Sequence, residues 1–278
     1  MLTARQIVDE YKESIPHWAS KSMRDRYPAM VAQFVVSIGP KKVYTKTDAI
    51  KWLNRLTNEG RSKGHIRWCA YVLTSFYRSL ELDPPFKGRE YPSGPSDDEL
   101  VTSAPALTKN AIREMIEAVL DRGDHRMMAF LAISTTYGLR AEELSRIKKD
   151  DVTRTTFAVH TAKGGAERVH KVPKEIVECI SDYDFPKLHT QSIINLFKAI
   201  QKLTGHKHKH REGWHSIRRR LVQELEDAGV SERHRYAFMR WGARRRGIIG
   251  VYSKPKPDEA DDKVFKDHPF LKYWREDE

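Results

Sequence analysis

Two segments in the middle of the sequence carry basic side chains at places where an ordinary globular helix would not need them. Arg140 follows Gly138 at the end of an apolar run, so it lies at a helix break from which a guanidinium can reach into a cleft. Glu143, one helical turn later, could orient that guanidinium. Lys163 lies in the polar stretch 160–167, where a turn lysine can reach a phosphate or donate a proton. Taken singly, these residues also fit a helix cap with a surface salt bridge and a solvated turn lysine.

Two later segments add an imidazole, a further guanidinium and two aromatic side chains. His215 and Arg218 are three residues apart, so on a helix both side chains point the same way and could hold a phosphate oxygen while sharing a proton. A basic helix that faces DNA without catalysis explains the same pair. Trp241 can only donate a hydrogen bond through its indole N–H. Tyr252 could be a nucleophile or simply a rim aromatic.

The charge balance indicates a polyanionic partner. The 278 residues include 50 Lys and Arg against 38 Asp and Glu, a formal charge of +12. The segment 257–278 is acidic, so the body is still more basic than the total, which favours nucleic acid as the partner. No run approaches the ~18 apolar residues of a membrane span. Two cysteines are too few for a disulfide framework or a Cys-based zinc site. We therefore expect a cytoplasmic, DNA-associated protein that does not bind membranes.

The elements that must position these residues fall into four segments. We expect a helical domain over 1–82, an extended proline-rich linker over 83–106, a mixed domain over 107–256 and an acidic tail over 257–278. Helical periodicity predicts helices in the first domain near 3–14, 21–38, 47–59 (capped by Thr47-Asp48) and 63–82. In the second domain we expect a helix capped by Thr108, a buried helix over 127–136, a β-hairpin from 155–159 and 168–172, and helices near 174–181, 190–203, 215–228 and 231–239.

The order of the four polar segments resembles the catalytic domain of the tyrosine recombinase (phage integrase) family. That family's pattern is Arg, a hairpin Lys, His-x-x-Arg, His or Trp, and a nucleophilic Tyr. The matching motifs are Gly138-Leu139-Arg140-x-x-Glu143-Leu144, Asp151-Val152, Arg168 with Val172-Pro173, Ala228-Gly229-Val230 and Trp241. Gly60-Arg61-Ser62 leading to Ser75-Phe76-Tyr77-Arg78 is similar to the family's core-binding domain. The resemblance covers residues from about 20 to 252.

The resemblance implies a mainly α fold with a small β-hairpin (α+β), in which a helical core-binding domain precedes a mixed catalytic domain. It also implies a site-specific recombinase or integrase that cleaves and rejoins DNA through a 3′-phosphotyrosyl intermediate without ATP. The implied catalytic residues are Arg140, Lys163, His215, Arg218, Trp241 and Tyr252. In these roles Tyr252 is the nucleophile, Lys163 is the general acid and His215 takes or shares the tyrosine proton.

The resemblance implies no metal and no other cofactor, and double-stranded DNA as the partner, bound by a homo-oligomer from dimer to tetramer. A tyrosine-based transposase, a topoisomerase-like strand transferase and a non-catalytic DNA-binding relative remain alternatives. Alternating histidines at 206, 208 and 210 could bind a metal, but the lysines between them favour a basic DNA-contacting loop.

This sequence departs from the family pattern at three places. Arg240 stands where the family often has Gly, Arg219 stands where a His is usual, and the spacing from Trp241 to Tyr252 is about two residues longer. The apolar residues of the acidic tail, which include Val264 and Phe270, suggest that the tail packs on a neighbouring protomer.

Overall fold

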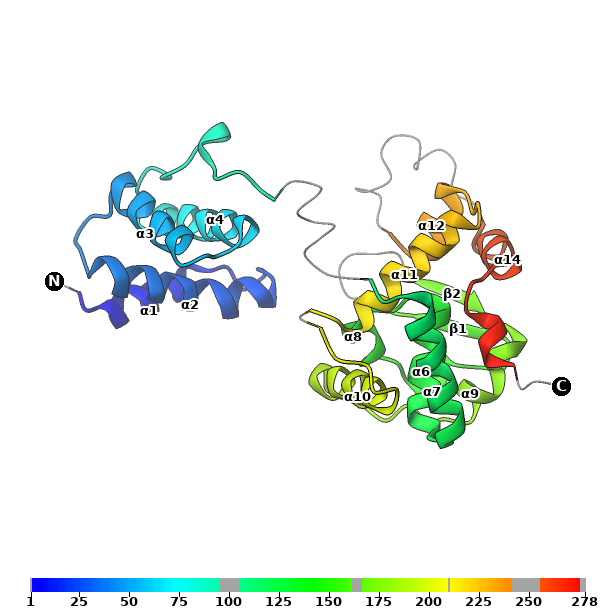
Figure 1. The fold of residues 1–278 in the computed structure, drawn as a ribbon. Coiled ribbons are helices and arrows are strands. Elements are labelled where there is room, and N and C mark those ends of the chain that lie inside the picture. Colours follow the sequence, from blue (N-terminus) through cyan, green and yellow to red (C-terminus); the bar gives the residue numbers. More distant parts are fainter. Residues whose placement is uncertain (1, 96–105, 162–166, 210, 242–255, 276–278) are drawn as a thin grey trace. The chain divides into compact units, whose positions relative to one another are not determined.

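The computed structural model describes residues 2–95, 106–161, 167–209, 211–241 and 256–275 (Figure 1). The chain divides into two compact units, Met1–Val101 and Thr102–Glu278. Each unit has its own hydrophobic core. In the described residues the fold is mainly α with one two-stranded antiparallel sheet, as expected from the sequence. No helix in these ranges is both long enough and apolar enough to cross a membrane.

The N-terminal unit is a bundle of four helices. They are α1 (Ala4–Ser14), α2 (Lys21–Ile38), α3 (Lys46–Asn58) and α4 (Lys63–Ser79). Phe34 and Phe76 lie fully buried at its centre and contact each other edge to face. The sequence places the cap of α3 at Thr47-Asp48, but the structure places it at Thr45. The Thr45 side chain accepts from the backbone N–H of Asp48, and the Asp48 carboxylate accepts from the backbone N–H of Thr45. The helix therefore begins at Lys46, two residues before the start that a cap at Thr47 would give.

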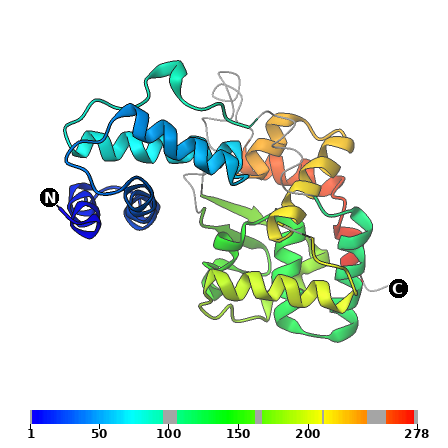
Figure 2. The ribbon, with the colours of Figure 1, turned by 60° about the vertical axis from the view of Figure 1, so that its left-hand side comes forward.

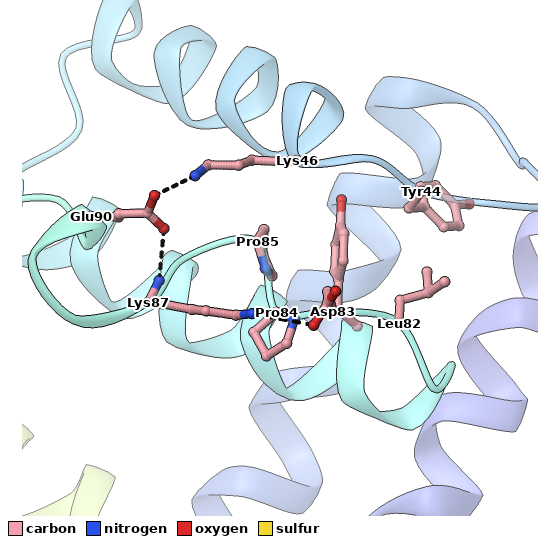
Figure 3. A pocket seen from close by; sticks show the side chains of 9 residues that line it. Tyr44, Lys46, Leu82, Asp83, Pro84, Pro85, Lys87 and Glu90 are labelled. Carbon is pink, nitrogen blue, oxygen red and sulfur yellow. Dashed lines mark hydrogen bonds and ion pairs between the residues drawn. The ribbon is translucent and has the colours of Figure 1, made fainter.

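The first half of the expected linker belongs to this bundle. Phe86 is buried in the N-terminal core, and the short 3₁₀ helix η1 (Gly88–Glu90) follows it. Glu90 accepts from Lys46 Nζ of α3 at 2.6 Å. The segment closes one side of a pocket of about 460 Å³ that Tyr44 and Lys46 also line (Figure 3). Apolar burial of Phe86 thus holds this part of the expected connector against the bundle, and the bounds of the linker over 83–106 stay a prediction. Residues 96–105 lie outside the described ranges.

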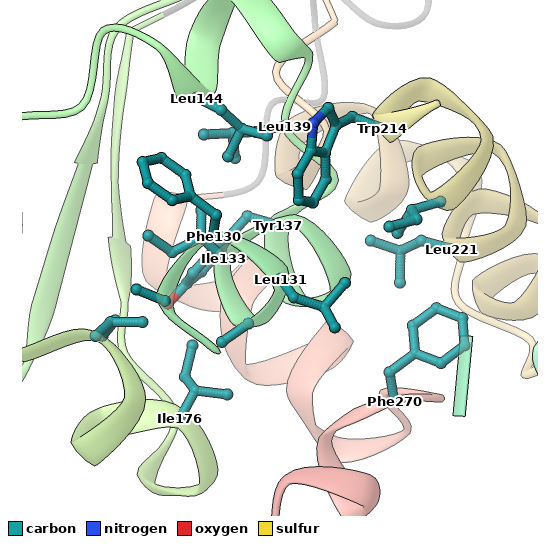
Figure 4. Packing of buried hydrophobic residues seen from close by; sticks show 14 of the residues in the cluster. Phe130, Leu131, Ile133, Tyr137, Leu139, Leu144, Ile176, Trp214, Leu221 and Phe270 are labelled. Carbon is teal, nitrogen blue, oxygen red and sulfur yellow. The ribbon is translucent and has the colours of Figure 1, made fainter. Parts of the chain in front are cut away.

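The second unit is built around the buried helix α7 (His125–Tyr137), which packs against α6 (Lys109–Arg122), α9 (Val177–Ser181) and α11 (Trp214–Asp227). All but three residues of α7 are buried, because helices cover it on several sides (Figures 1 and 2). Figure 4 shows the side chains of this core, among them Phe130, Leu131, Ile133, Tyr137, Leu139, Leu144, Ile176, Trp214, Leu221 and Phe270. The remaining helices are α8 (Ala141–Leu144), α10 (Thr190–Leu203) and α12 (Glu232–Phe238), with 3₁₀ turns η2 (Lys149–Asp151) and η3 (Lys174–Ile176).

The predicted hairpin is present. Strand β1 (Thr156–Val159) pairs antiparallel with β2 (Arg168–Lys171), so that Phe157 lies opposite His170. Both of these side chains are buried, and their strands lie near the C-terminal end of α7, where the Tyr137 ring contacts both. The predicted turn around Lys163 falls in residues 162–166, which lie outside the described residues.

The acidic tail packs on its own unit. Helix α14 (Pro257–Lys266) lies against β2 and α12, and the 3₁₀ turn η5 (Leu271–Trp274) lies against α6 and η3. Val264, Phe270 and Trp274 are members of the core of this unit. The Trp274 indole donates to Thr135 Oγ1 of α7 at 3.1 Å. The apolar tail residues therefore cover their own unit in this chain, and the expectation that they pack on a neighbouring protomer is corrected.

Candidate active site

Arg140 lies between helix α7, which ends at Tyr137, and helix α8, which begins at Ala141. Gly138 ends α7 in the left-handed conformation, with φ +61°, and Arg140 then caps the short helix α8. Glu143 accepts from Arg140 Nη1 at 2.7 Å and from the Arg140 backbone N–H at 2.9 Å. The Arg140 side chain is partly exposed and that of Glu143 is fully buried. The structure thus confirms that Glu143 orients Arg140. The same carboxylate accepts from the backbone N–H of Arg140 and from its guanidinium group.

Arg218 connects the first motif with the last. It lies in the second turn of α11 and is only 2% exposed. Its Nη1 donates to the Gly138 carbonyl at 2.6 Å, and its Nη2 donates to the Met239 carbonyl at 2.7 Å. A Cβ at Gly138 would lie 2.8 Å from Met239 Cε and 3.3 Å from Arg218 Cγ. Glycine is therefore needed at 138 both for the positive φ and for the close approach of these two side chains.

Trp241 and His215 lie on either side of Arg218 in the sequence. The Arg218 guanidinium carbon is 5.9 Å from the centre of the Trp241 ring, within the range of a cation–π contact. Trp241 is half-buried and also packs edge to face against Tyr236. His215 lies in the first turn of α11, three residues before Arg218, as the spacing predicts. Unlike Arg218, His215 is exposed, so its imidazole is accessible to a substrate.

The structure therefore brings together three of the six expected catalytic residues, Arg140, Arg218 and Trp241, around the carbonyl of Gly138 and the end of α12. His215 stands on the same helix as Arg218. Lys163 and Tyr252 fall outside the described residues, so their roles stay predictions.

In the sequence, Arg240 is only a departure from the family pattern, but in the structure it lies at the centre of the site. It has a positive φ of +55° and is 3% exposed. Its Nη2 atom lies 3.8 Å from Glu143 Oε2, so the carboxylate that holds Arg140 also faces a second guanidinium. Burial lowers the pKa of Arg240 to about 10, with Glu143 acting in the opposite direction, so the group stays protonated at neutral pH. The sequence signal for this role is a charged residue directly before Trp241, at a position where the family often has glycine.

A buried ionic network continues from Arg240 to the tail. His170 of β2 lies 3.1 Å from Arg240 Nη1 through Nε2 and 3.0 Å from Asp261 Oδ1 through Nδ1. Asp261 of α14 also accepts from Arg168 Nη2 at 2.6 Å and from the backbone N–H of Lys171 at 2.8 Å. Burial lowers the pKa of His170 to about 4, so the imidazole is neutral at physiological pH. Local sequence patterns cannot predict this network, because its members lie up to 93 residues apart.

The electrostatics of the site favour an anion. In the described part of the site, the guanidinium groups of Arg140, Arg218 and Arg240 are accompanied by the single carboxylate of Glu143. Burial would raise the pKa of Glu143, but the Arg140 backbone N–H and the charges of Arg240 and Arg140 lower it below its ordinary value. The carboxylate is thus ionised at neutral pH, and the cluster keeps an excess of two positive charges.

The histidine-rich loop has its own local partners. His206 Nε2 lies 3.1 Å from Glu212 Oε2, and His208 Nδ1 lies 2.6 Å from Gln201 Oε1. Glu212 also accepts from the backbone N–H of Lys209, so it ties the loop to the start of α11. Among the residues that the structure describes, no group of three or more His, Cys, Asp or Glu side chains is arranged to hold a metal ion. His210 is outside those residues.

Comparisons with known proteins agree with this arrangement. No model of a known protein family matches the chain. Among curated proteins, tyrosine recombinase XerA of Thermococcus kodakarensis is 28% identical over 139 residues. This match covers 49% of the chain and 46% of XerA, so the chain spans about half the length of that relative.

Two solved structures share the fold. A lambda integrase dimer bound to a COC′ core site matches with a TM-score of 0.66 and 13% identity, over 90% of this chain and 76% of the other. The Tn1549 transposon integrase in complex with transposon right end DNA matches with a TM-score of 0.61 and 15% identity, over 95% and 99%. The resemblance to the tyrosine recombinase family that the motifs indicate is therefore confirmed at the level of the fold.

Proposed function

We propose that this chain is a tyrosine-type site-specific DNA recombinase, which breaks and rejoins DNA strands by transesterification through a 3′-phosphotyrosyl intermediate and needs no ATP. The observation that carries this proposal is the pair of hydrogen bonds from Arg218 to the carbonyls of Gly138 and Met239. They bring the Arg140 motif and the Trp241 motif, about 100 residues apart in sequence, to the same guanidinium. A DNA-binding helix without catalysis would not require this convergence.

The chemistry follows from the charges in the site. A phosphodiester carries one negative charge, and its pentavalent transition state concentrates further charge on the non-bridging oxygens. Arg140, whose side chain is partly exposed, presents a fork-shaped donor set that neutralises this charge, and the buried Arg218 adds its positive charge beneath it. In a buried site such donors act more strongly than in water, because the surrounding dielectric constant is low. The excess of positive charge in the cluster thus matches the charge that develops during the reaction.

The remaining roles are assigned to the residues that the resemblance implies. Tyr252 attacks the phosphorus and becomes joined to the 3′-phosphate, while the 5′-oxygen leaves as a hydroxyl. Lys163 donates the proton to that leaving oxygen, and His215 takes or shares the tyrosine proton. Trp241 donates a hydrogen bond to a phosphate oxygen. A 5′-hydroxyl from another strand then attacks the phosphotyrosine and restores the phosphodiester, so bond energy is conserved throughout.

Double-stranded DNA is the proposed partner, with the chain acting as a dimer or tetramer on it. Three observations support this: the +12 formal charge, the fold shared with the lambda integrase dimer bound to a core site, and the fold shared with a transposon integrase in complex with transposon end DNA. Lysine and arginine contacts to phosphates would make the affinity fall steeply with salt concentration.

The proposal is tested by trapping the covalent intermediate. The protein is incubated with a pool of nicked duplexes whose central sequence is randomised. Cleavage close to the nick releases a short 5′-hydroxyl fragment that diffuses away, so rejoining is blocked. We expect a protein–DNA adduct that survives denaturing electrophoresis, and sequencing of the adducts gives the preferred site. Mass spectrometry of the adduct should place the DNA on Tyr252.

Matched tyrosine variants locate the nucleophile. We expect Y252F to form no adduct and Y236F and Y273F to keep it. Absence of an adduct with the wild-type protein refutes the catalytic proposal, and an adduct in Y252F moves the nucleophile to another residue. Products joined between two DNA molecules indicate recombination, whereas relaxation of supercoiled plasmid alone indicates a topoisomerase-like activity.

A further inference from the structure

Arg240 occupies a backbone conformation that its own side chain does not favour. At φ +55° its Cβ crowds the following carbonyl, which is why glycine is the usual residue in this region of the backbone. The residue follows α12 directly and precedes Trp241. An arginine kept in this conformation must be held by interactions of its side chain.

The Arg240 guanidinium has such interactions on several sides. Its Nη1 and Nη2 atoms both donate to the Tyr137 carbonyl at 3.3 Å, and Nη1 also donates to the Phe238 carbonyl at 3.3 Å. The Tyr137 carbonyl is at the end of α7, one residue before the glycine that positions Arg140. Arg240 therefore clamps the last turn of α12 onto the last turn of α7.

The same guanidinium faces the carboxylate that holds Arg140. Glu143 Oε1 accepts from Arg140 Nη1, and Oε2 accepts from the Arg140 backbone N–H and lies 3.8 Å from Arg240 Nη2. Glu143 is fully buried, so water cannot take the place of a lost partner without reorganisation. Removing Arg240 would leave the buried carboxylate with Arg140 alone and free it to turn.

His170 fixes the other side of the guanidinium. An arginine only donates, so His170 Nε2, 3.1 Å from Arg240 Nη1, must accept. The ring proton is therefore on Nδ1, where it is donated to Asp261 Oδ1 at 3.0 Å. The orientation of Arg240 is thus set by a defined tautomer on a fully buried strand residue.

We propose that Arg240 is a positioning residue of the strand-transfer reaction: it holds Glu143, and through Glu143 it holds Arg140 in the orientation that meets the phosphate. Arg240 is buried and does not touch the DNA, so it acts on the rate of the chemical step and not on DNA affinity. The inference rests on the proposed function, whose failure the experiment below detects separately.

The test compares R240G, R240K and the control R122Q, which changes an exposed arginine at the end of α6. Glycine suits the positive φ, so R240G removes the guanidinium without adding backbone strain. At saturating nicked DNA, we expect R240G to form the adduct between about 10-fold and 100-fold more slowly than wild type, the range expected for a misplaced catalytic group. DNA affinity should stay within about threefold of the wild-type value, since uniform binding is not altered. R240K should recover part of the rate, because it keeps the charge but not the planar donor set, and R122Q should match wild type.

A double-mutant cycle with E143Q separates positioning from general damage to the fold. If Arg240 acts through Glu143, R240G should slow the E143Q protein by no more than about twofold, the limit of additivity error. Losses that multiply overturn the proposal, as does a folded R240G protein that cleaves within about twofold of wild type. If R240G does not fold, the same cycle is run with R240K, and the same outcomes decide.

A readout without catalysis keeps the two proposals apart. In protein with isotope-labelled arginine, the Nε–H signal of Arg140, assigned with R140K, should shift or broaden in R240G and not in R122Q. If the wild-type protein forms no adduct, the proposed function fails, and an unchanged Arg140 signal in R240G then overturns the positioning role by itself.

Discussion

The carboxylate of Asp261 is the point at which the C-terminal helix is joined to the rest of its unit, and its loss should be costly. The side chain is fully buried and accepts from Arg168 Nη2, from His170 Nδ1 and from the backbone N–H of Lys171. Substitution by asparagine keeps the size of the side chain but removes the charge. It leaves Arg168 without its buried counter-charge and places an NH₂ group opposite the backbone N–H of Lys171, which can only donate.

The expected magnitude follows from the burial of the pair. Breaking a buried ion pair by removing one partner costs about 3–5 kcal/mol, because the remaining charge is left uncompensated. An asparagine carbonyl in the place of Oδ1 can still accept two of the three hydrogen bonds, those from Arg168 and His170, so we expect the lower end, about 3 kcal/mol. For a unit of this size each kcal/mol lowers Tm by about 2–4 °C, which predicts a fall of about 6–12 °C for D261N.

The adjacent residue provides the control. Asp262 pairs with Lys171 Nζ at 2.6 Å, but both side chains are largely exposed. An exposed pair contributes at most about 1 kcal/mol, so D262N should lower Tm by no more than about 4 °C. Both variants replace an aspartate of α14 by asparagine. The difference between their Tm values therefore measures the contribution of burial and hydrogen bonding.

The assay is differential scanning calorimetry of the full chain, together with hydrogen exchange of peptides from α7 and α14. The exchange data show which unit unfolds in each transition and whether α14 detaches before the core opens. The reasoning is refuted if D261N unfolds within about 1 kcal/mol of D262N, because the buried network would then contribute no more than a surface pair.

Two further predictions concern the glycine that ends α7 and the buried histidines. G138A should be destabilised by about 1–2 kcal/mol through its positive φ alone. G138A should also cleave DNA more slowly, since its Cβ would lie 2.8 Å from Met239 Cε. The control G123A has a similar φ of +65° but open space around the position. It should show only the stability loss in thermal melts and leave the rate of single-turnover cleavage unchanged. Burial lowers the pKa values of His170 and His268 to about 4, so the stability that their neutral forms provide is complete above pH 6.5 and is lost as the pH falls from 6.5 toward 4. In urea unfolding between pH 7 and 5, the free energy of unfolding should fall by about 1.4 kcal/mol per pH unit below pH 6.5 for each histidine. H268Q should reduce this slope. A free energy of unfolding that does not change with pH would contradict the assignment.

Most elements of the fold could be predicted from the sequence, because they depend on local signals. The helix expected over 190–203 matches α10, and the hairpin expected from 155–159 and 168–172 matches β1 and β2 to within one residue at each end. The cap of α3 was misplaced because Thr45 and Thr47 are both acceptable cap residues by type. Only the reciprocal hydrogen bonds of Thr45 with Asp48 decide between them.

Long-range packing could not be predicted in the same way. The acidic composition of 257–278 indicates a solvated tail, but α14 buries Ala260, Asp261 and Val264 and packs Phe265 against the core, while its other described charged side chains are exposed. Phe86 lies among prolines and glycines that favour an extended chain, yet its ring is buried in the N-terminal core. In each case a few buried side chains decide the position of the segment, and their partners are distant in sequence.

The candidate site shows the same division between local and distant information. Arg140, Arg218 and Trp241 could be found because their spacing follows a pattern, and the structure brings them together. Arg240 departs from that pattern, and its role depends on acceptors that only the fold supplies. The position requires a left-handed backbone, which glycine adopts without cost. A side chain there is retained only if the surroundings compensate, and the Tyr137 and Phe238 carbonyls with Glu143 do so. An arginine at 240 therefore depends on Glu143 and His170, so these three residues should tolerate substitution together and not singly.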